Sequence, residues 1–241
     1  MWTDFPLVIG RISLEPPRRP WLFGCFVKIA LAQLNPTVGA IRSNAALAMA
    51  AVEQASREGA RLVVTPELLI SGYPPKDLLL RESFVDACDR VVEELASELP
   101  DNIALLIGHP THRDVPDGRI ANAASLLHSG RIQQTARKTL LPNYDVFDEQ
   151  RYFRSGDAVS PIVYDNLRLG VHICEDAWWG EPNTFYHDPG SPRPDPVAEL
   201  ADAGVDLLVN LSASPFELDK PGRRRELAAR HAPAHLSLIH I

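Results

Sequence analysis

Apolar runs and helical patterns alternate along the chain from residue 27 onward. Runs with the length of a buried strand are separated by segments whose apolar positions recur every three or four residues, which is typical of helices that bury one face. The expected strands cover residues 27–35, 61–69, 103–109 and 205–212. The expected helices run from a cap at Ser43 or Asn44 to near Gly59, over 83–99, near 196–203 and over 222–232.

Two hairpins interrupt this alternation. Residues 121–128 and 131–138 flank Ser129 and Gly130, and residues 161–165 and 167–174 flank Asn166. A short polar turn between two apolar runs is typical of a β-hairpin. An order that mixes strand–helix–strand units with hairpins predicts an α/β fold, with a large mixed sheet system and helices outside it.

The two ends of the chain break the pattern. Residues 1–26 contain four prolines, show no period and lack the order of charged and apolar regions found in a signal peptide. We expect an irregular leader there, disordered or a start-site artefact, followed by one domain over residues 27–241. The final HLSLIHI resembles a strand that stops early, so we expect this domain to be incomplete at its C-terminal end.

Composition excludes several function classes. The chain has 241 residues, 45% of them hydrophobic, and 24 basic against 31 acidic side chains give a net charge of −7, which disfavours nucleic-acid binding. Three widely spaced cysteines fit a reducing, cytoplasmic location better than a disulfide framework. No apolar run reaches the roughly 20 residues that span a membrane. The pairs His109/His112 and His172/Cys174 lack further ligands, so we expect no metal site.

Three reactive side chains stand at the ends of apolar strands: Glu67, Lys138 and Cys174. Such positions project into the crevice where α/β folds bind ligands. A thiol that is partly exposed at a polar turn is a good nucleophile when a base lies nearby. From the residues alone, a core cysteine and two solvated charges stay open as alternatives.

The segments TPELLISGYPPKDLL, RKTLLPNYDVFDEQRYF and HICEDAWW resemble the three signature segments of the nitrilase superfamily of carbon–nitrogen hydrolases. KIALAQLNPTVGAI and NLSASPFELDKPGRRR resemble further segments of one branch, the N-terminal glutaminase domain of glutamine-dependent NAD synthetases. The resemblance implies a four-layer α-β-β-α sandwich that forms homo-oligomers. It also implies a catalytic triad with Glu67 as the base, Lys138 beside the oxyanion and Cys174 as the nucleophile.

The resemblance implies further site residues. Glu149 matches a second glutamate, which would orient Lys138. Contacts to the substrate L-glutamine fall on Tyr144, Ser214 and Lys220. Other residues that flank the triad segments, and so are expected to line the pocket, are Tyr73, Phe147, Glu175 and Trp178.

The implied reaction is hydrolysis of the glutamine amide through a cysteine thioester, without a cofactor. The ammonia would serve a downstream synthetase domain, which uses ATP and Mg to amidate nicotinic acid adenine dinucleotide to NAD. The pyrophosphate loop of that domain is absent from this sequence. Two alternatives stay open, a stand-alone nitrilase-like amidase for another small amide and an inactive dimer scaffold.

Overall fold

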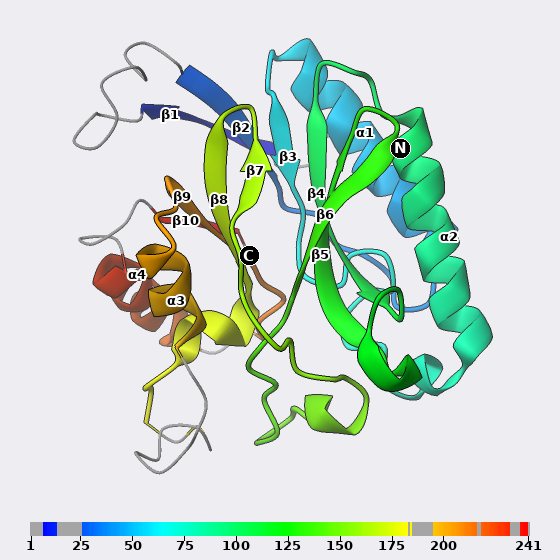
Figure 1. The fold of residues 1–241 in the computed structure, drawn as a ribbon, viewed down its shortest axis with the longest axis vertical. Helices are drawn as coiled ribbons and strands as arrows, with labels where there is room; N and C mark the ends of the chain where they lie inside the picture. The colour runs from blue at the N-terminus through cyan, green and yellow to red at the C-terminus, as the bar shows by residue number, and fades with distance from the viewer. Residues whose placement is uncertain are drawn as a thin grey trace.

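The computed structural model describes residues 7–13, 26–182, 184, 195–215, 218–231 and 237–240, of which 7–13, 26 and 237–240 are described by their backbone alone. Two sheets face each other, and helices cover their outer faces (Figure 1). The order of layers is therefore helix, sheet, sheet, helix, as the family resemblance implies.

The first sheet has six strands in the order β1-β2-β3-β4-β5-β6. Strands β2, β3 and β4 are parallel, whereas β1 and the β4-β5-β6 meander pair antiparallel. The bounds are β1 Leu7–Ser13, β2 Phe26–Ala32, β3 Leu62–Val64, β4 Ala104–Thr111, β5 Ala121–His128 and β6 Arg131–Arg137.

The second sheet has four strands in the order β10-β9-β8-β7. Strands β8, β9 and β10 are parallel, and β7 closes a hairpin with β8. The bounds are β7 Ile162–Tyr164, β8 Leu167–Ile173, β9 Leu207–Leu211 and β10 Ser237–His240. The chain crosses to this sheet only after β6, so the ends of β3, β6 and β8 approach one another from different sheets.

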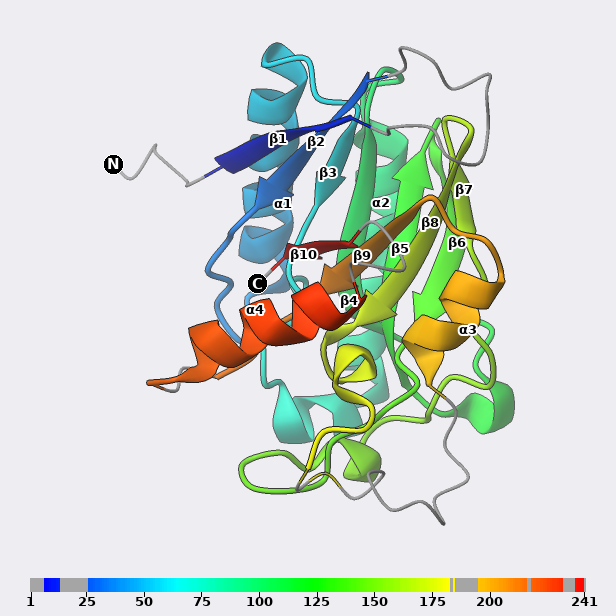
Figure 2. The ribbon, with the colours of Figure 1, turned by 90° about the vertical axis from the view of Figure 1, so that its left-hand side faces the viewer.

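Helices α1 (Ile41–Arg57) and α2 (Glu82–Glu98) cover the outer face of the six-stranded sheet. Helix α3 (Pro196–Asp202) packs on the outer face of the four-stranded sheet, with α4 (Lys220–His231) on the same side of the molecule (Figure 2). Short 3₁₀ turns include η2 (Lys76–Leu80), η3 (Pro116–Gly118), η4 (Glu149–Arg151) and η5 (Cys174–Trp178).

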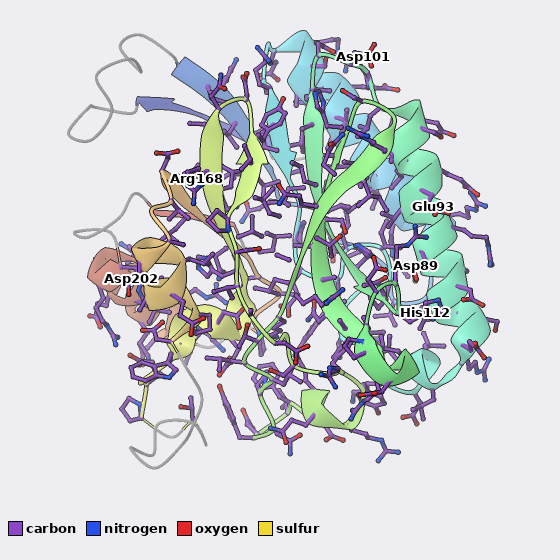
Figure 3. The ribbon with its side chains drawn as sticks, in the orientation of Figure 1. Asp89, Glu93, Asp101, His112, Arg168 and Asp202 are labelled. Atoms are coloured by element: carbon purple, nitrogen blue, oxygen red, sulfur yellow. The ribbon has the colours of Figure 1, made fainter. Side chains whose placement is uncertain are left out.

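The main core lies between the sheets. Alternate residues of both sheets point inward and form one buried cluster, for example Leu106 and Leu126 against Val171 and Val209. Side chains from both sheets fill the space between them (Figure 3). Because both sheets bury this face, the segments that leave the ends of their strands are attached to a well-packed core.

The two hairpins and the helices near 83–99, 196–203 and 222–232 are confirmed, with shifts of a few residues at their ends. The strand expected over 61–69 ends at Val64. Pro66 lacks an N–H for further pairing, and Leu68 has a φ of 49°, so the chain turns away there.

The helix cap predicted at Ser43 or Asn44 is wrong, because α1 begins at Ile41 and its N-cap is Ala40. Asn44 is buried instead, and its side chain bonds the backbone of Thr37 and Ile70. The leader also differs from its prediction, since residues 7–13 form β1 along β2. Its β-branched residues favour such pairing. The domain boundary at residue 27 stays a prediction.

Candidate active site

Glu67 lies just after β3, with its carboxylate closed off from solvent. Oε1 accepts hydrogen bonds from Nζ of Lys138 at 2.7 Å and from Nδ2 of Asn122 at 2.8 Å. Oε2 accepts the backbone N–H of Ala213 at 3.0 Å. Three donors, from β5, the residue after β6 and the loop after β9, therefore fix the orientation of this carboxylate.

Lys138 follows β6 and is almost fully buried. Its Nζ lies 2.7 Å from Glu67 and 2.9 Å from Oε1 of Glu149. Burial disfavours the ammonium charge, but Glu149 and Glu67 outweigh burial and raise the pKa of Lys138 well above its ordinary value. The side chain therefore supplies a permanent positive charge in a dry environment, where such a charge acts strongly.

Glu149 begins η4 and is the second carboxylate that pairs with Lys138, with Oε2 2.8 Å from Nζ. The hydroxyl of Tyr73 donates to its Oε1 at 3.0 Å. Burial raises the pKa of Glu149 to about 7, against the opposing charge of Lys138. Tyr73, expected in the substrate pocket, thus contacts the supporting glutamate.

Cys174 is the first residue of η5, directly after β8, and has a φ of 44°. That conformation is uncommon outside glycine and lifts the residue out of the strand line. The prediction of a partly exposed thiol is wrong, because only 6% of Cys174 is exposed. The segment after β9 covers it, with Oγ of Ser212 donating to Sγ at 3.3 Å.

The buried thiol needs a base. Burial first, and then the charge of Glu67, raise the pKa of Cys174 above its ordinary value. The thiol therefore holds its proton at neutral pH and becomes nucleophilic as a base removes that proton.

Two cavities meet at this cluster. One of about 160 Å³ is lined by Cys174 and by most of the predicted substrate residues, Tyr144, Phe147, Glu175, Trp178, Ser214 and Lys220. The other, of about 640 Å³, is lined by Glu67, Glu149 and Tyr73. Phe147 and Ser214 line both cavities, so they separate the two spaces.

The smaller cavity carries both signs of charge. Tyr144 donates its hydroxyl to Glu175 and packs edge-on against Phe147, with ring centres 5.7 Å apart. Burial raises the pKa of Glu175. Lys220 is buried in the same wall, and the Arg223 guanidinium lies 5.5 Å from the centre of the Trp178 ring. The cavity thus presents a carboxylate and cations to one small ligand.

Sequence reasoning missed three groups that contact the triad. Asn122 and the backbone of Ala213 hold Glu67, and Ser212 contacts Cys174. Ser212 follows an apolar strand, the same signal that pointed to the triad. Asn122 stands as a polar residue in an apolar strand, which is a second usable signal.

Among the described residues, neither a cluster of metal ligands nor a membrane-spanning helix is present. There, no group of three or more His, Cys, Asp or Glu side chains has the placement to hold a metal ion. Within the same residues, no helix combines the length and apolar character needed to cross a bilayer.

Comparison with known proteins agrees with this geometry. The glutamine-dependent NAD(+) synthetase of Synechocystis sp. is 45% identical over 213 residues, which are 85% of this chain and 37% of that protein. The glutamine-dependent NAD(+) synthetase of Thermotoga maritima is 36% identical over 208 residues, 86% of this chain and 33% of that protein. The chain therefore spans about a third of the length of these relatives.

Solved structures are also similar to this chain. A glutamine-dependent NAD+ synthetase from Acinetobacter baumannii superposes with a TM-score of 0.76 at 31% identity, covering 88% of this chain and 38% of that one. An amidase of the nitrilase superfamily from Nesterenkonia AN1 has a TM-score of 0.69 at 23% identity, covering 89% and 76%, and so shares the fold. The family described as carbon-nitrogen hydrolase matches residues 28–191. This match covers most of the chain, and the chain belongs to the carbon–nitrogen hydrolase family.

Proposed function

We propose that this chain hydrolyses the side-chain amide of L-glutamine through a thioester on Cys174. The observation that carries the proposal is the buried contact between Glu67 and Lys138, 2.7 Å apart, beside a buried thiol. An amide is a weak electrophile. It needs a base, a nucleophile and a fixed positive charge together, and this cluster supplies all three.

Acylation follows from these positions. Sγ of Cys174 attacks the amide carbon while Glu67 takes the thiol proton. The carbonyl oxygen becomes an oxyanion, which Nζ of Lys138 stabilises. Glu67 then passes the proton to the amide nitrogen, the C–N bond breaks, and ammonia leaves behind a glutamyl thioester.

Deacylation uses the same groups. A water molecule attacks the thioester carbon while Glu67 takes one of its protons. The second oxyanion forms beside Lys138, the C–S bond breaks, and the proton returns to Sγ. Glutamate leaves, and Glu149 keeps the ammonium group of Lys138 in place through both halves.

Recognition of glutamine requires groups for its α-ammonium and α-carboxylate. The carboxylate of Glu175 suits the ammonium, and the buried cation of Lys220 suits the carboxylate. Tyr144 holds Glu175, while Phe147, Ser214 and Trp178 shape the walls. We assign Tyr73 to the support of Glu149 instead.

The relatives suggest where the ammonia goes. Two of them carry the name glutamine-dependent NAD(+) synthetase, and this chain aligns with 37% and 33% of their lengths. We propose that the ammonia serves a synthetase domain that uses ATP and Mg. The glutaminase step itself would need no cofactor. A homo-oligomer stays a prediction from the family resemblance.

An amide panel tests the substrate. The 241-residue chain is incubated with L-glutamine, D-glutamine, glutaramate and acetamide, and ammonia is measured. We expect L-glutamine to be preferred by at least about tenfold over glutaramate, because glutaramate lacks the ammonium that Glu175 would bind. Equal rates on both would favour the stand-alone amidase, and no hydrolysis of any amide would favour an inactive scaffold.

A further inference from the structure

One buried carboxylate outside the triad bridges two of its members. Asp176 lies in η5, two residues after Cys174, and is 1% exposed. Its Oδ1 accepts the backbone N–H groups of Thr139 at 2.9 Å and Leu140 at 2.7 Å. Its Oδ2 accepts the N–H of Ile173 at 2.9 Å.

The N–H groups that Asp176 accepts lie next to two triad residues in the sequence. Thr139 and Leu140 directly follow Lys138, and Ile173 directly precedes Cys174. The first segment leaves β6 in one sheet, and the second leaves β8 in the other. A single rigid carboxylate thus ties the chain beside the ammonium group to the chain beside the thiol.

The reaction depends on the distance between the Lys138 ammonium and the Cys174 thiol. The attacked carbon must lie near Sγ while its oxygen lies within hydrogen-bond reach of Nζ, and a displacement of about 1 Å costs on the order of 100-fold in rate. Lys138 is tethered to the first sheet by its own backbone N–H, which donates to Asn122 at 2.8 Å. Asp176 supplies the link from that sheet to the thiol.

We infer that Asp176 is a positioning residue whose carboxylate sets the distance between the Lys138 ammonium and the Cys174 thiol. The inference rests on the proposed amide hydrolysis. Three N–H donors leave no place for an amide NH₂, so Asp176→Asn loses at least one of the three bonds and loosens the link.

The first measurement is steady-state glutamine hydrolysis, normalised to the thiol that a glutamine-like electrophile labels. We expect Asp176→Asn to lower kcat about 100-fold and to change KM by less than about threefold. Asp89→Asn is the matched control. Asp89 is a buried carboxylate on α2 that accepts from Thr111 at 2.6 Å, outside the six-stranded sheet (Figure 3). The kcat of Asp89→Asn should equal that of the parent chain.

The second measurement separates positioning from general stabilisation. If Asp176 acts by placing Lys138, then Asp176→Asn should lower kcat less than about fivefold in a Lys138→Gln background, because the partner that it positions is gone. A full 100-fold loss in that background, or an unchanged kcat in the single variant, would overturn the inference. If Asp176→Asn does not fold, Asp176→Glu replaces it in both measurements. Its longer side chain keeps the charge but displaces the carboxylate from the three N–H groups.

The parent chain separates this failure from failure of the proposed function. Absence of glutamine hydrolysis in the parent would refute the function. Hydrolysis in the parent with equal kcat in the Asp176 variants would refute only the positioning role.

Discussion

Oε1 of Glu67 lies 2.7 Å from Nζ of Lys138, and neither side chain is exposed to solvent. Breaking a buried pair by removing one partner costs about 3–5 kcal/mol, because the other charge is left uncompensated. The pair therefore serves two ends at once. It holds a base and a cation together beside the Cys174 thiol, and it joins the segment after β3 to the segment after β6.

Lys138→Gln tests the positive charge. We expect kcat for glutamine to fall by about 100-fold or more, as for loss of an oxyanion donor. The free energy of unfolding should also fall by about 3–5 kcal/mol, since Glu67 and Glu149 lose their shared cation. Steady-state kinetics and urea unfolding measure the two effects.

Lys28→Gln is the control for that substitution. Lys28 lies on β2 and donates to the backbone of Glu58, away from the triad. Its loss should change stability by less than about 0.5 kcal/mol and leave kcat unchanged. Equal turnover in the two variants would remove Lys138 from the mechanism.

Cys174→Ala should abolish glutamine hydrolysis and leave glutamine binding nearly unchanged, because the nucleophile acts in the chemical step. Cys88→Ala should turn over glutamine at the rate of the parent chain. Cys88 is fully buried in the cluster beneath α1 and α2, and burial raises its pKa to about 12, so the thiol is inert. Calorimetric binding and ammonia release distinguish the variants, and the same activity loss in both would contradict the choice of nucleophile.

Gly108→Ala tests the backbone support of the base. A Cβ at Gly108 on β4 would lie 2.4 Å from the Pro66 carbonyl oxygen and 2.9 Å from Cα of Glu67. Relieving this overlap should cost about 1–3 kcal/mol and lower kcat at least about tenfold, because Glu67 moves. Gly222→Ala in α4, where a Cβ meets nothing within 4 Å, should show neither effect. A Gly108→Ala variant with normal kinetics would contradict this close approach.

His172 predicts how stability depends on pH. Burial lowers the pKa of this β8 residue to about 4, whereas an unfolded histidine titrates near 6.5. Between these values the unfolded chain binds the extra proton. The free energy of unfolding should therefore fall as pH drops from about 6.5 to 4, by at most about 1.4 kcal/mol per pH unit from this group.

His172→Gln should reduce that slope, measured by urea unfolding at several pH values. His128→Gln, at a half-buried position on β5, provides the comparison. If the parent chain and His172→Gln have parallel pH profiles, His172 does not supply this dependence.

Much of the fold follows from the sequence because the apolar runs are long and the hairpin turns are marked by residues such as Ser129-Gly130 and Asn166. The errors have tertiary causes. Asn44 resembles a helix cap, yet it is held by Ile70, 26 positions later. Cys174 resembles a partly exposed thiol because the residue that covers it, Ser212, lies 38 positions away. Asp176 gives no local signal for its link to Lys138, since Thr139 and Leu140 follow β6 of the other sheet, 36 or more positions away.

Covalent trapping tests the central claim most directly. The parent chain is mixed with excess L-glutamine, quenched in acid within milliseconds to seconds, digested and examined by mass spectrometry. We predict a glutamyl group in thioester linkage on Cys174, formed with release of one ammonia per chain and absent from Cys174→Ala. Glutamine turnover without an adduct on Cys174, or an adduct on Cys88 instead, would contradict the account.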